Sequence, residues 1–239
     1  MNLLDLGKPP LHFTLIDPDK QDEGEAAVIA GGAQDFGSDA IMVGGSTAHG
    51  QTVSDTVFRI KRECSLPVIL FPSGASGVCT QADYLFFMML MNSQSPRFLV
   101  GEQVKAAPFL RDSGVEPISM GYIVVSTSEN PTKVEQVGRV DRILPGEVDK
   151  ALAYALCAQY FGLSCVYLEA GSGASRPVPY EMIKAVKTQV NLPLIVGGGV
   201  RDVSSARGVL EAGADVLVTG TIAEENLGRL SEIVSAVKR

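Results

Sequence analysis

Eight short apolar runs recur along the chain at fairly even spacing, and each is bounded by Gly, Pro, Asp or Ser. They are rich in Val, Ile, Leu and Phe without strict polar alternation, which is typical of parallel strands buried on both faces. The predicted strands are residues 11–16, 40–44, 67–71, 83–89, 118–125, 165–168, 193–196 and 215–218. This repetition constrains the fold more than any other feature of the sequence.

Segments with helical periodicity separate most of these runs. The predicted helices are residues 22–36, 53–63, 98–111, 147–160, 180–189, 203–211 and 224–237. Strands that alternate with helices indicate βαβ units and a parallel sheet. Eight such units favour an α/β fold of the closed (β/α)8 TIM-barrel type over a doubly wound sheet, although the count alone leaves the second arrangement open.

The connection between Pro72 and Asp83 departs from this pattern. It begins with small residues, including Gly74 and Gly77, and is too short for a three-turn helix with its loops. We therefore predict an irregular segment in place of the barrel's third helix. By contrast, residues 126–163 are long enough to hold extra structure before their helix.

Length and charge limit the classes of protein. The 239 residues match the roughly 250 residues of a TIM barrel, and no linker is visible, so we predict a single domain over residues 1–239. The net charge is −7 and Lys and Arg form no run. A nucleic-acid-binding domain normally carries a basic patch, so nucleic acid is not expected as a partner.

The cysteines and the apolar runs indicate the compartment. No CxxC pair occurs among Cys64, Cys79, Cys157 and Cys165, which argues against a zinc site or a disulfide scaffold. The first residues lack a signal peptide, and the longest apolar run, from Tyr84 to Met91, is far below the ~20 residues of a membrane-spanning helix. We expect a cytoplasmic protein without an integral membrane segment; an oily substrate remains open.

Asp17 ends the first predicted strand, where barrels place their active sites. Pro18 holds Asp17 extended. A carboxylate at this position suits Mg²⁺, which takes one or two protein oxygens together with substrate phosphates and water. The alternative is that Asp17 caps the following helix.

The second strand ends in Gly44-Gly45-Ser46-Thr47. The glycines permit close approach of the backbone, and the hydroxyl groups could contact a metal or a phosphate. The alternative is an ordinary glycine-rich turn, which the segment taken alone favours.

Glycine-rich turns follow three later strands. Glu169 ends the sixth strand and precedes a small Gly/Ser loop, Gly197-Gly198-Gly199 ends the seventh, and Gly220-Thr221 follows the eighth. Backbone N–H groups at such turns bind phosphate, and barrels place their standard phosphate site after strands seven and eight. The sequence therefore predicts phosphate binding there.

Tyr84 to Asn92 is unusually rich in Met and Phe. A buried barrel strand accounts for most of this composition. The second interpretation is a channel for a flexible hydrocarbon chain, because Met side chains adapt to irregular apolar shapes.

Together, these segments resemble the geranylgeranylglyceryl phosphate synthase family, the barrel prenyltransferases that form the first ether bond of archaeal membrane lipids. The resemblance extends over nearly the whole chain. It rests on residues 12–20, 43–47, 121–124, 167–173, 197–199 and 220–221, and the missing third helix agrees with the family's modified barrel.

The resemblance implies a reaction and a set of site residues. The 3-hydroxyl of sn-glycerol 1-phosphate would attack C1 of geranylgeranyl diphosphate, and diphosphate would leave. Asp17 and Ser46 would hold Mg²⁺, and Glu169 would be the candidate base, with Asp17 the second catalytic residue. The implied acceptor site comprises Tyr167, Leu168, Glu169, Ala170, Gly171, Ser172, Gly173, Gly198, Gly199, Gly220 and Thr221.

The chain departs from the family pattern at two positions, and two rival functions are also compatible with the sequence. Thr14 stands where some members have a lysine that contacts glycerol phosphate, and Ser46 replaces a threonine. The rivals are another phosphate-binding barrel enzyme, such as a sugar-phosphate isomerase, and a non-catalytic phosphate-binding regulator. A symmetric homo-oligomer is the expected assembly.

Overall fold

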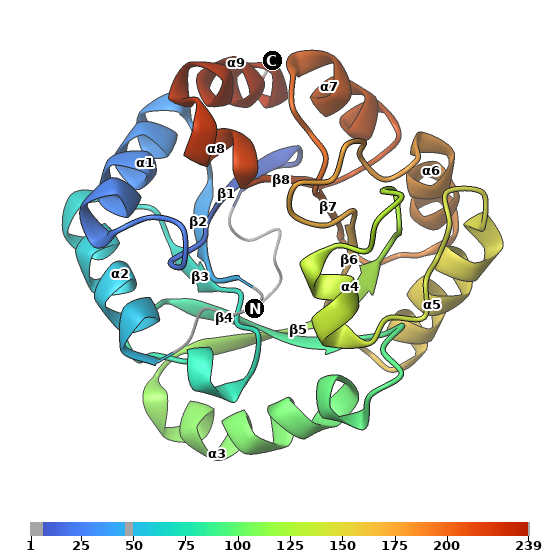
Figure 1. The fold of residues 1–239 in the computed structure, drawn as a ribbon, viewed down its shortest axis with the longest axis horizontal. Helices are drawn as coiled ribbons and strands as arrows, with labels where there is room; N and C mark the ends of the chain where they lie inside the picture. The colour runs from blue at the N-terminus through green and yellow to red at the C-terminus, as the bar shows by residue number, and fades with distance from the viewer. Residues whose placement is uncertain (1–6, 46–49, 239) are drawn as a thin grey trace.

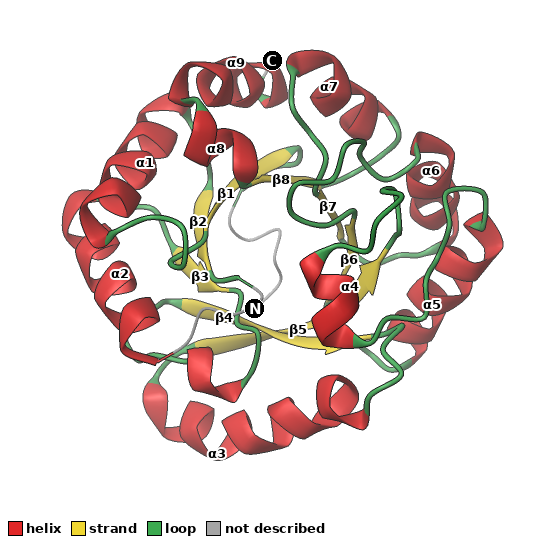
Figure 2. Ribbon diagram, viewed as in Figure 1, coloured by secondary structure: helices red, strands yellow, loops and turns green. Residues whose placement is uncertain are grey.

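A computed structural model describes residues 7–45 and 50–238, and eight parallel strands form a closed barrel in it (Figures 1 and 2). The strands follow chain order, and β8 pairs with β1, which excludes the doubly wound sheet. They are β1 (Leu11–Ile16), β2 (Ala40–Val43), β3 (Val68–Leu70), β4 (Tyr84–Leu90), β5 (Glu116–Val124), β6 (Cys165–Glu169), β7 (Leu194–Gly197) and β8 (Val216–Thr219). All eight predicted strands are confirmed, with ends shifted by no more than two residues.

The strands are buried on both faces because side chains fill the barrel and helices cover it outside (Figure 2). On β1, Leu11 and Phe13 belong to the inner apolar cluster, whereas Ile16 packs in the outer cluster with helix residues. This double burial explains why the sequence shows continuous apolar runs rather than alternation.

A polar network lies between β1 and the outer layer. The ring of His12 is fully buried, with Nδ1 2.8 Å from Ser38 Oγ and Nε2 3.0 Å from Thr219 Oγ1. Burial lowers the pKa of His12 to about 3, so the ring is neutral. Thr14 Oγ1 lies 2.9 Å from Ser38 Oγ, so Thr14 belongs to this buried network.

Most helices surround the barrel (Figure 1). The longer ones are α1 (Glu23–Phe36), α2 (Gly50–Glu63), α3 (Glu102–Ser113), α5 (Val148–Tyr160), α6 (Tyr180–Gln189), α7 (Val203–Glu211) and α9 (Leu227–Val237). The start of α1 shows why its sequence is helical at this point. Asp22 accepts the Glu25 N–H and Glu25 accepts the Asp22 N–H, a capping box that satisfies both backbone donors.

Two predicted helices need correction. The segment 224–237 is not one helix: α8 (Thr221–Glu225) ends before Asn226, whose extended backbone and side chain, which accepts the Arg229 N–H, begin α9. Apolar periodicity continues across this break, so the sequence pattern concealed it. The segment 98–111 begins with a π-helical turn, η3 (Arg97–Gly101), before α3.

The predicted departure from the regular barrel is confirmed. Between β3 and β4 the chain forms only a three-residue 3-10 turn, η2 (Ala75–Gly77), in the described structure. The long connection after β5 holds an additional short helix, α4 (Lys133–Gly138), as the length of residues 126–163 predicted. Figure 1 shows α4 and α8 at one end of the barrel, inside the ring of longer helices.

The cysteines are unpaired, as predicted, and Cys64, Cys79 and Cys165 are buried. Within residues 7–45 and 50–238, no helix is both long and apolar enough to cross a membrane.

Candidate active site

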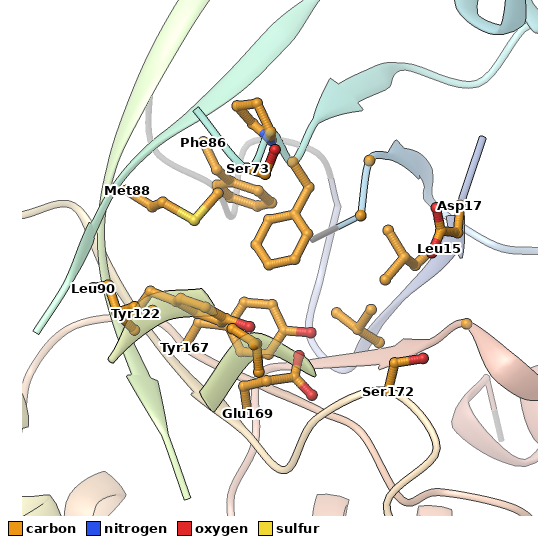
Figure 3. Close-up of a pocket in the computed structure, with 18 of the residues that line it drawn as sticks. Leu15, Asp17, Ser73, Phe86, Met88, Leu90, Tyr122, Tyr167, Glu169 and Ser172 are labelled. Carbon is orange, nitrogen blue, oxygen red and sulfur yellow. The ribbon is translucent and has the colours of Figure 1, made fainter. Parts of the chain in front are cut away.

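A deep cavity opens at the carboxyl ends of the strands (Figure 3). Its volume is about 1470 Å³, including its open mouth. Residues at or just after the ends of seven strands contribute to its lining, together with Tyr122 near the end of β5: Asp17, Gly44, Phe71, Leu90, Glu169, Gly198 and Gly220. The cavity therefore lies on the face where TIM barrels place their active sites.

Asp17 lies on one side of this cavity. Its Oδ1 accepts the Asp19 N–H at 3.1 Å, and its side chain is 18% exposed. Burial raises the pKa of Asp17, and the Asp19 N–H and the Lys20 ammonium oppose that shift. The alternative that Asp17 caps α1 is wrong, because Asp22 caps that helix.

Gly45 keeps the space beside Asp17 open. A Cβ atom on Gly45 would lie 2.4 Å from Asp17 Oδ1, closer than real Cβ contacts. Gly44 has a packing role instead, because a Cβ atom there would meet the Phe71 carbonyl oxygen at 2.0 Å. Ser46, the second predicted metal ligand, lies outside the described residues.

Glu169 lies across the cavity from Asp17 (Figure 3). It is the last residue of β6 and is only 5% exposed. Its Oε1 accepts the Gly171 N–H at 2.6 Å. Burial raises the pKa of Glu169, and the hydrogen bond from Gly171 opposes that shift. A carboxylate with a raised pKa in a cleft is a candidate for proton transfer.

An aromatic cluster separates the polar and apolar parts of the cavity. The ring of Tyr167 stacks on Phe71, with centroids 5.7 Å apart, and meets Tyr122 edge-on at 5.3 Å. The Tyr167 hydroxyl is buried beside the Glu169 carboxylate, and burial first, then Glu169, raises the pKa of Tyr167. The buried Tyr167 hydroxyl and the Glu169 carboxylate therefore act on each other in this part of the cavity.

The two glycine turns also line the cavity. Gly198 and Gly199 adopt left-handed backbones, with φ of 80° and 70°, which glycine adopts without steric cost. A Cβ atom on Gly198 would lie 2.4 Å from Glu169 Oε1, and one on Gly199 would lie 2.2 Å from the Arg176 carbonyl oxygen. The turn after β7 therefore packs directly on the β6 loop, while Gly220 and Thr221 face the cavity from β8.

The structure divides the predicted run 167–173. Tyr167, Glu169 and Ser172 line the cavity. Leu168 and Ala170 do not: their buried side chains pack in the outer cluster. Their predicted substrate contacts, which only the backbone of these two residues could make, stay predictions. Successive side chains on a strand point to opposite faces. Gly173 also lies outside the lining, and its carbonyl oxygen accepts Arg201 Nη2 at 3.5 Å.

Several lining residues received no role in the sequence analysis. Lys20 and Glu224 line the polar side, and Phe71 and Tyr122 belong to the aromatic cluster. Lys20 and Tyr122 lie in segments that carry the resemblance. The one sequence signal that could have placed such residues in the cavity is a position just after the end of a strand.

The apolar part of the cavity passes through the barrel wall. In the described chain, β3 pairs with β4 only at Tyr84 and Leu85, whereas β5 pairs along Tyr84–Leu90. The lining includes Phe86, Met88 and Leu90, which belong to or pack on the inner cluster, and Leu85 and Phe87 from the outer cluster. Val78 and Ala106 continue it outside. Because no full helix follows β3, an apolar channel remains between β3 and α3, the helix that follows β4.

The interpretation of the Met- and Phe-rich segment as a buried barrel strand is confirmed, because it forms β4. The same strand lines the channel (Figure 3), and the interpretation that the channel holds a hydrocarbon chain stays a prediction.

Gly198→Ala is expected to weaken the site without unfolding the protein. The added methyl group would collide with Glu169 Oε1 and with the Gly171 backbone, so it would displace the candidate base and narrow the turn. Gly162→Ala is a matched control, because Gly162 has a similar φ of 73° and no atom within 4 Å of its Cβ position. The measurement is binding of a phosphate ester by calorimetry, with thermal melts of both variants. Normal binding by Gly198→Ala would show that the turn is misassigned.

Comparisons with known proteins agree over nearly the whole chain. The PcrB family matches residues 5–238. The geranylgeranylglyceryl phosphate synthase of Pyrococcus horikoshii is 46% identical over 221 residues, which is 92% of this chain and 86% of that protein. The corresponding enzyme of Methanosarcina acetivorans is 47% identical over 233 residues, 95% of this chain and 93% of that protein.

Solved structures give the same result. The geranylgeranylglyceryl phosphate synthase of Thermoplasma acidophilum, solved in complex with its substrate sn-glycerol-1-phosphate, is 41% identical and superposes with a TM-score of 0.93 over 100% of this chain and 99% of that chain. An N-acetylmannosamine-6-phosphate 2-epimerase from Clostridium perfringens, 14% identical with a TM-score of 0.60, covers 92% of this chain and 90% of that one and shares the fold alone.

Proposed function

The chain belongs to the PcrB family, and we propose that it is a geranylgeranylglyceryl phosphate synthase, which joins the 3-hydroxyl of sn-glycerol 1-phosphate to C1 of geranylgeranyl diphosphate. The observation that carries this function is the two-part cavity. One part has carboxylates and glycine turns, and the other is an apolar channel that leaves the barrel through its wall. Such a cavity suits a donor with an ionic head and a long apolar tail.

We propose that the acceptor binds between the turns after β6, β7 and β8. The phosphate would lie against the backbone of Gly198, Gly199, Gly220 and Thr221, where no bulky side chain blocks its approach. The glycerol hydroxyls would then face Glu169 and the buried Tyr167 hydroxyl. Holding the acceptor in this way would place its 3-hydroxyl beside C1 of the donor, which is a large part of what such an enzyme must achieve.

Glu169 is the proposed base. As the bond between C1 and the diphosphate oxygen breaks, the acceptor oxygen forms the new bond to C1, and its proton passes to the Glu169 carboxylate. Burial raises the pKa of this group, and a base with a higher pKa accepts a proton more readily. The hydrogen bond from Gly171 orients the carboxylate.

The residues on the opposite side fit Mg²⁺. Asp17 faces the cavity beside the bare backbone of Gly45, and Ser46 is the second proposed ligand. No cluster of three or more His, Cys, Asp or Glu that could hold a metal occurs within the described residues. This donor set suits Mg²⁺ carried on a diphosphate, because the ion fills its other positions with substrate oxygens and water. When bound, it would neutralise charge on the departing diphosphate.

A product assay tests the function. Purified protein would be incubated with sn-glycerol 1-phosphate or its 3-phosphate enantiomer, and with prenyl diphosphates of increasing length. We expect ether product from the 1-phosphate, and kcat/KM should rise with tail length while the tail still gains contacts in the channel. Absence of ether product with every prenyl diphosphate would contradict the proposal.

The rival functions fit the cavity less well. A sugar-phosphate isomerase has no use for the apolar channel, and a phosphate-binding regulator has no use for a buried base beside it. Heat protection separates them, because a ligand that binds the native state raises its stability. A prenyl diphosphate and Mg²⁺ added together should raise the melting temperature of this protein, a result that neither rival function predicts.

We also propose that the chain works as a single domain in a symmetric, cytoplasmic homo-oligomer. The described helices pack on one barrel, and closed symmetric assembly is the common state of such enzymes. Light scattering of the purified protein would measure its mass, and a monomer would contradict the assembly.

A further inference from the structure

Lys20 connects three separate loops across the mouth of the cavity. Its Nζ lies 3.0 Å from Glu224 Oε2 on α8 and 3.2 Å from Ser172 Oγ in the loop after β6. It also lies 3.9 Å from Asp17 Oδ2 in its own loop. These partners are separated by up to 204 residues in sequence, so only closure of the barrel brings them together.

The local backbone sets the position of Lys20. The Lys20 N–H donates to the Asp17 carbonyl oxygen at 2.9 Å, and the Asp19 N–H donates to the Asp17 carboxylate. These bonds fold the segment after β1 into a tight turn. The side chain of Lys20 therefore starts beside Asp17 and extends toward the turns after β6 and β8.

The environment of the Lys20 ammonium suits an arriving anion. The side chain of Lys20 is 41% exposed at the cavity mouth, whereas that of Glu224 is 11% exposed. Carboxylates of Asp17, Glu169 and Glu224 line this part of the cavity, and the cations of the described lining are Lys20 and Lys133. A phosphate dianion carries more charge than the Glu224 carboxylate and can accept hydrogen bonds through three oxygens, so it can compete for the ammonium.

We propose that Lys20 binds the phosphate group of the acceptor, exchanging part of its contact with Glu224 and Ser172 for the phosphate oxygens. The acceptor is favoured over the donor diphosphate because the close partners of Nζ flank the glycine turns: Ser172 lies in the loop after β6, and Glu224 lies on α8, which follows β8. The identity of the acceptor as sn-glycerol 1-phosphate rests on the proposed function. The residue would then make the site selective for a phosphorylated acceptor.

A purely structural role makes a different prediction. In that case Lys20 would only neutralise Glu224, whose pKa is raised by burial and lowered again by Lys20. Removing the lysine would harm the protein because an unpaired, half-buried carboxylate is left behind. Removing that carboxylate as well would then restore binding, whereas a direct contact with phosphate could not be restored in this way.

The experiment is calorimetric titration of sn-glycerol 1-phosphate without prenyl diphosphate or divalent metal. Lys20→Met is expected to raise Kd by about 10- to 100-fold, the range for a charged hydrogen bond, and Lys20→Arg to recover most of the loss. Glu224→Gln should bind at least as tightly as the unmodified chain, and Lys20→Met combined with Glu224→Gln should stay as weak as Lys20→Met. Restored binding in the double variant, or unchanged binding in Lys20→Met, would overturn the proposal.

Two further measurements separate this inference from the proposed function. Inorganic phosphate should inhibit the unmodified enzyme more strongly than Lys20→Met, and KM for the prenyl diphosphate should change much less than KM for the acceptor. A larger change in the donor KM would overturn the assignment to the acceptor. If the unmodified chain forms ether product but Lys20→Met binds acceptor normally, only the Lys20 proposal fails. If the unmodified chain forms no product, the proposed function fails instead.

Discussion

Glu169→Gln is expected to lower kcat by roughly 10²–10⁴-fold, the range for loss of a general base, while KM for sn-glycerol 1-phosphate changes modestly. Glutamine keeps the size of the side chain and an oxygen that can accept the Gly171 N–H. It removes the ionised oxygen that takes the proton. Because the substitution also removes a buried charge, the melting temperature should stay equal or rise, and this excludes unfolding as the cause.

The pH profile gives an independent readout for Glu169. The base acts only when ionised, and burial raises its pKa above the ordinary glutamate value of about 4.3. Activity of the unmodified enzyme should therefore fall as the pH drops through this raised pKa. In Glu169→Gln the residual activity should lack that acid limb.

The kinetic constants distinguish two roles for Glu169. If the carboxylate only orients the acceptor, KM should rise while kcat is largely kept. If Glu169→Gln leaves both constants near those of the unmodified enzyme, the residue is structural and the proposed base is wrong.

Asp17→Asn is expected to reduce Mg²⁺-dependent turnover by on the order of 10²-fold or more, since it removes charge that holds the ion against the leaving diphosphate. Asparagine retains an oxygen that can accept the Asp19 N–H, so the turn after β1 should persist. Binding of sn-glycerol 1-phosphate without metal should not weaken, because Asp17 lies across the cavity from Glu169 (Figure 3) and its negative charge beside Lys20 disfavours a phosphate there.

A metal titration completes the test of Asp17. The concentration of Mg²⁺ at half-maximal rate should rise in Asp17→Asn. Asp19→Asn serves as the matched charge control, because Asp19 is not among the residues that line the cavity. Undiminished Mg²⁺-dependent turnover in Asp17→Asn would rule out its role at the metal.

The sequence by itself determined the parallel strands and their covering helices and favoured the closed barrel, while the pairing of β8 with β1 excluded the doubly wound sheet. Eight doubly buried runs leave few arrangements other than parallel strands covered by helices, and their order predicted which turns lie together at the carboxyl ends. Asp17, Glu169 and the glycines after β7 and β8 were found in this way, because their positions follow from the ends of local elements. The short β3–β4 connection likewise predicted the missing helix.

Only the tertiary structure decided what these elements enclose. The apolar channel depends on where β4 loses its partner β3, and the side chains of Leu168 and Ala170 point away from the cavity because of the strand's orientation in the barrel. The break at Asn226 was hidden because apolar periodicity continues through it. Lys20 meets Ser172 and Glu224 only when β1 closes against β8. Local periodicity records which face of an element is buried, whereas contacts between distant loops depend on strand register and closure, which no local pattern contains.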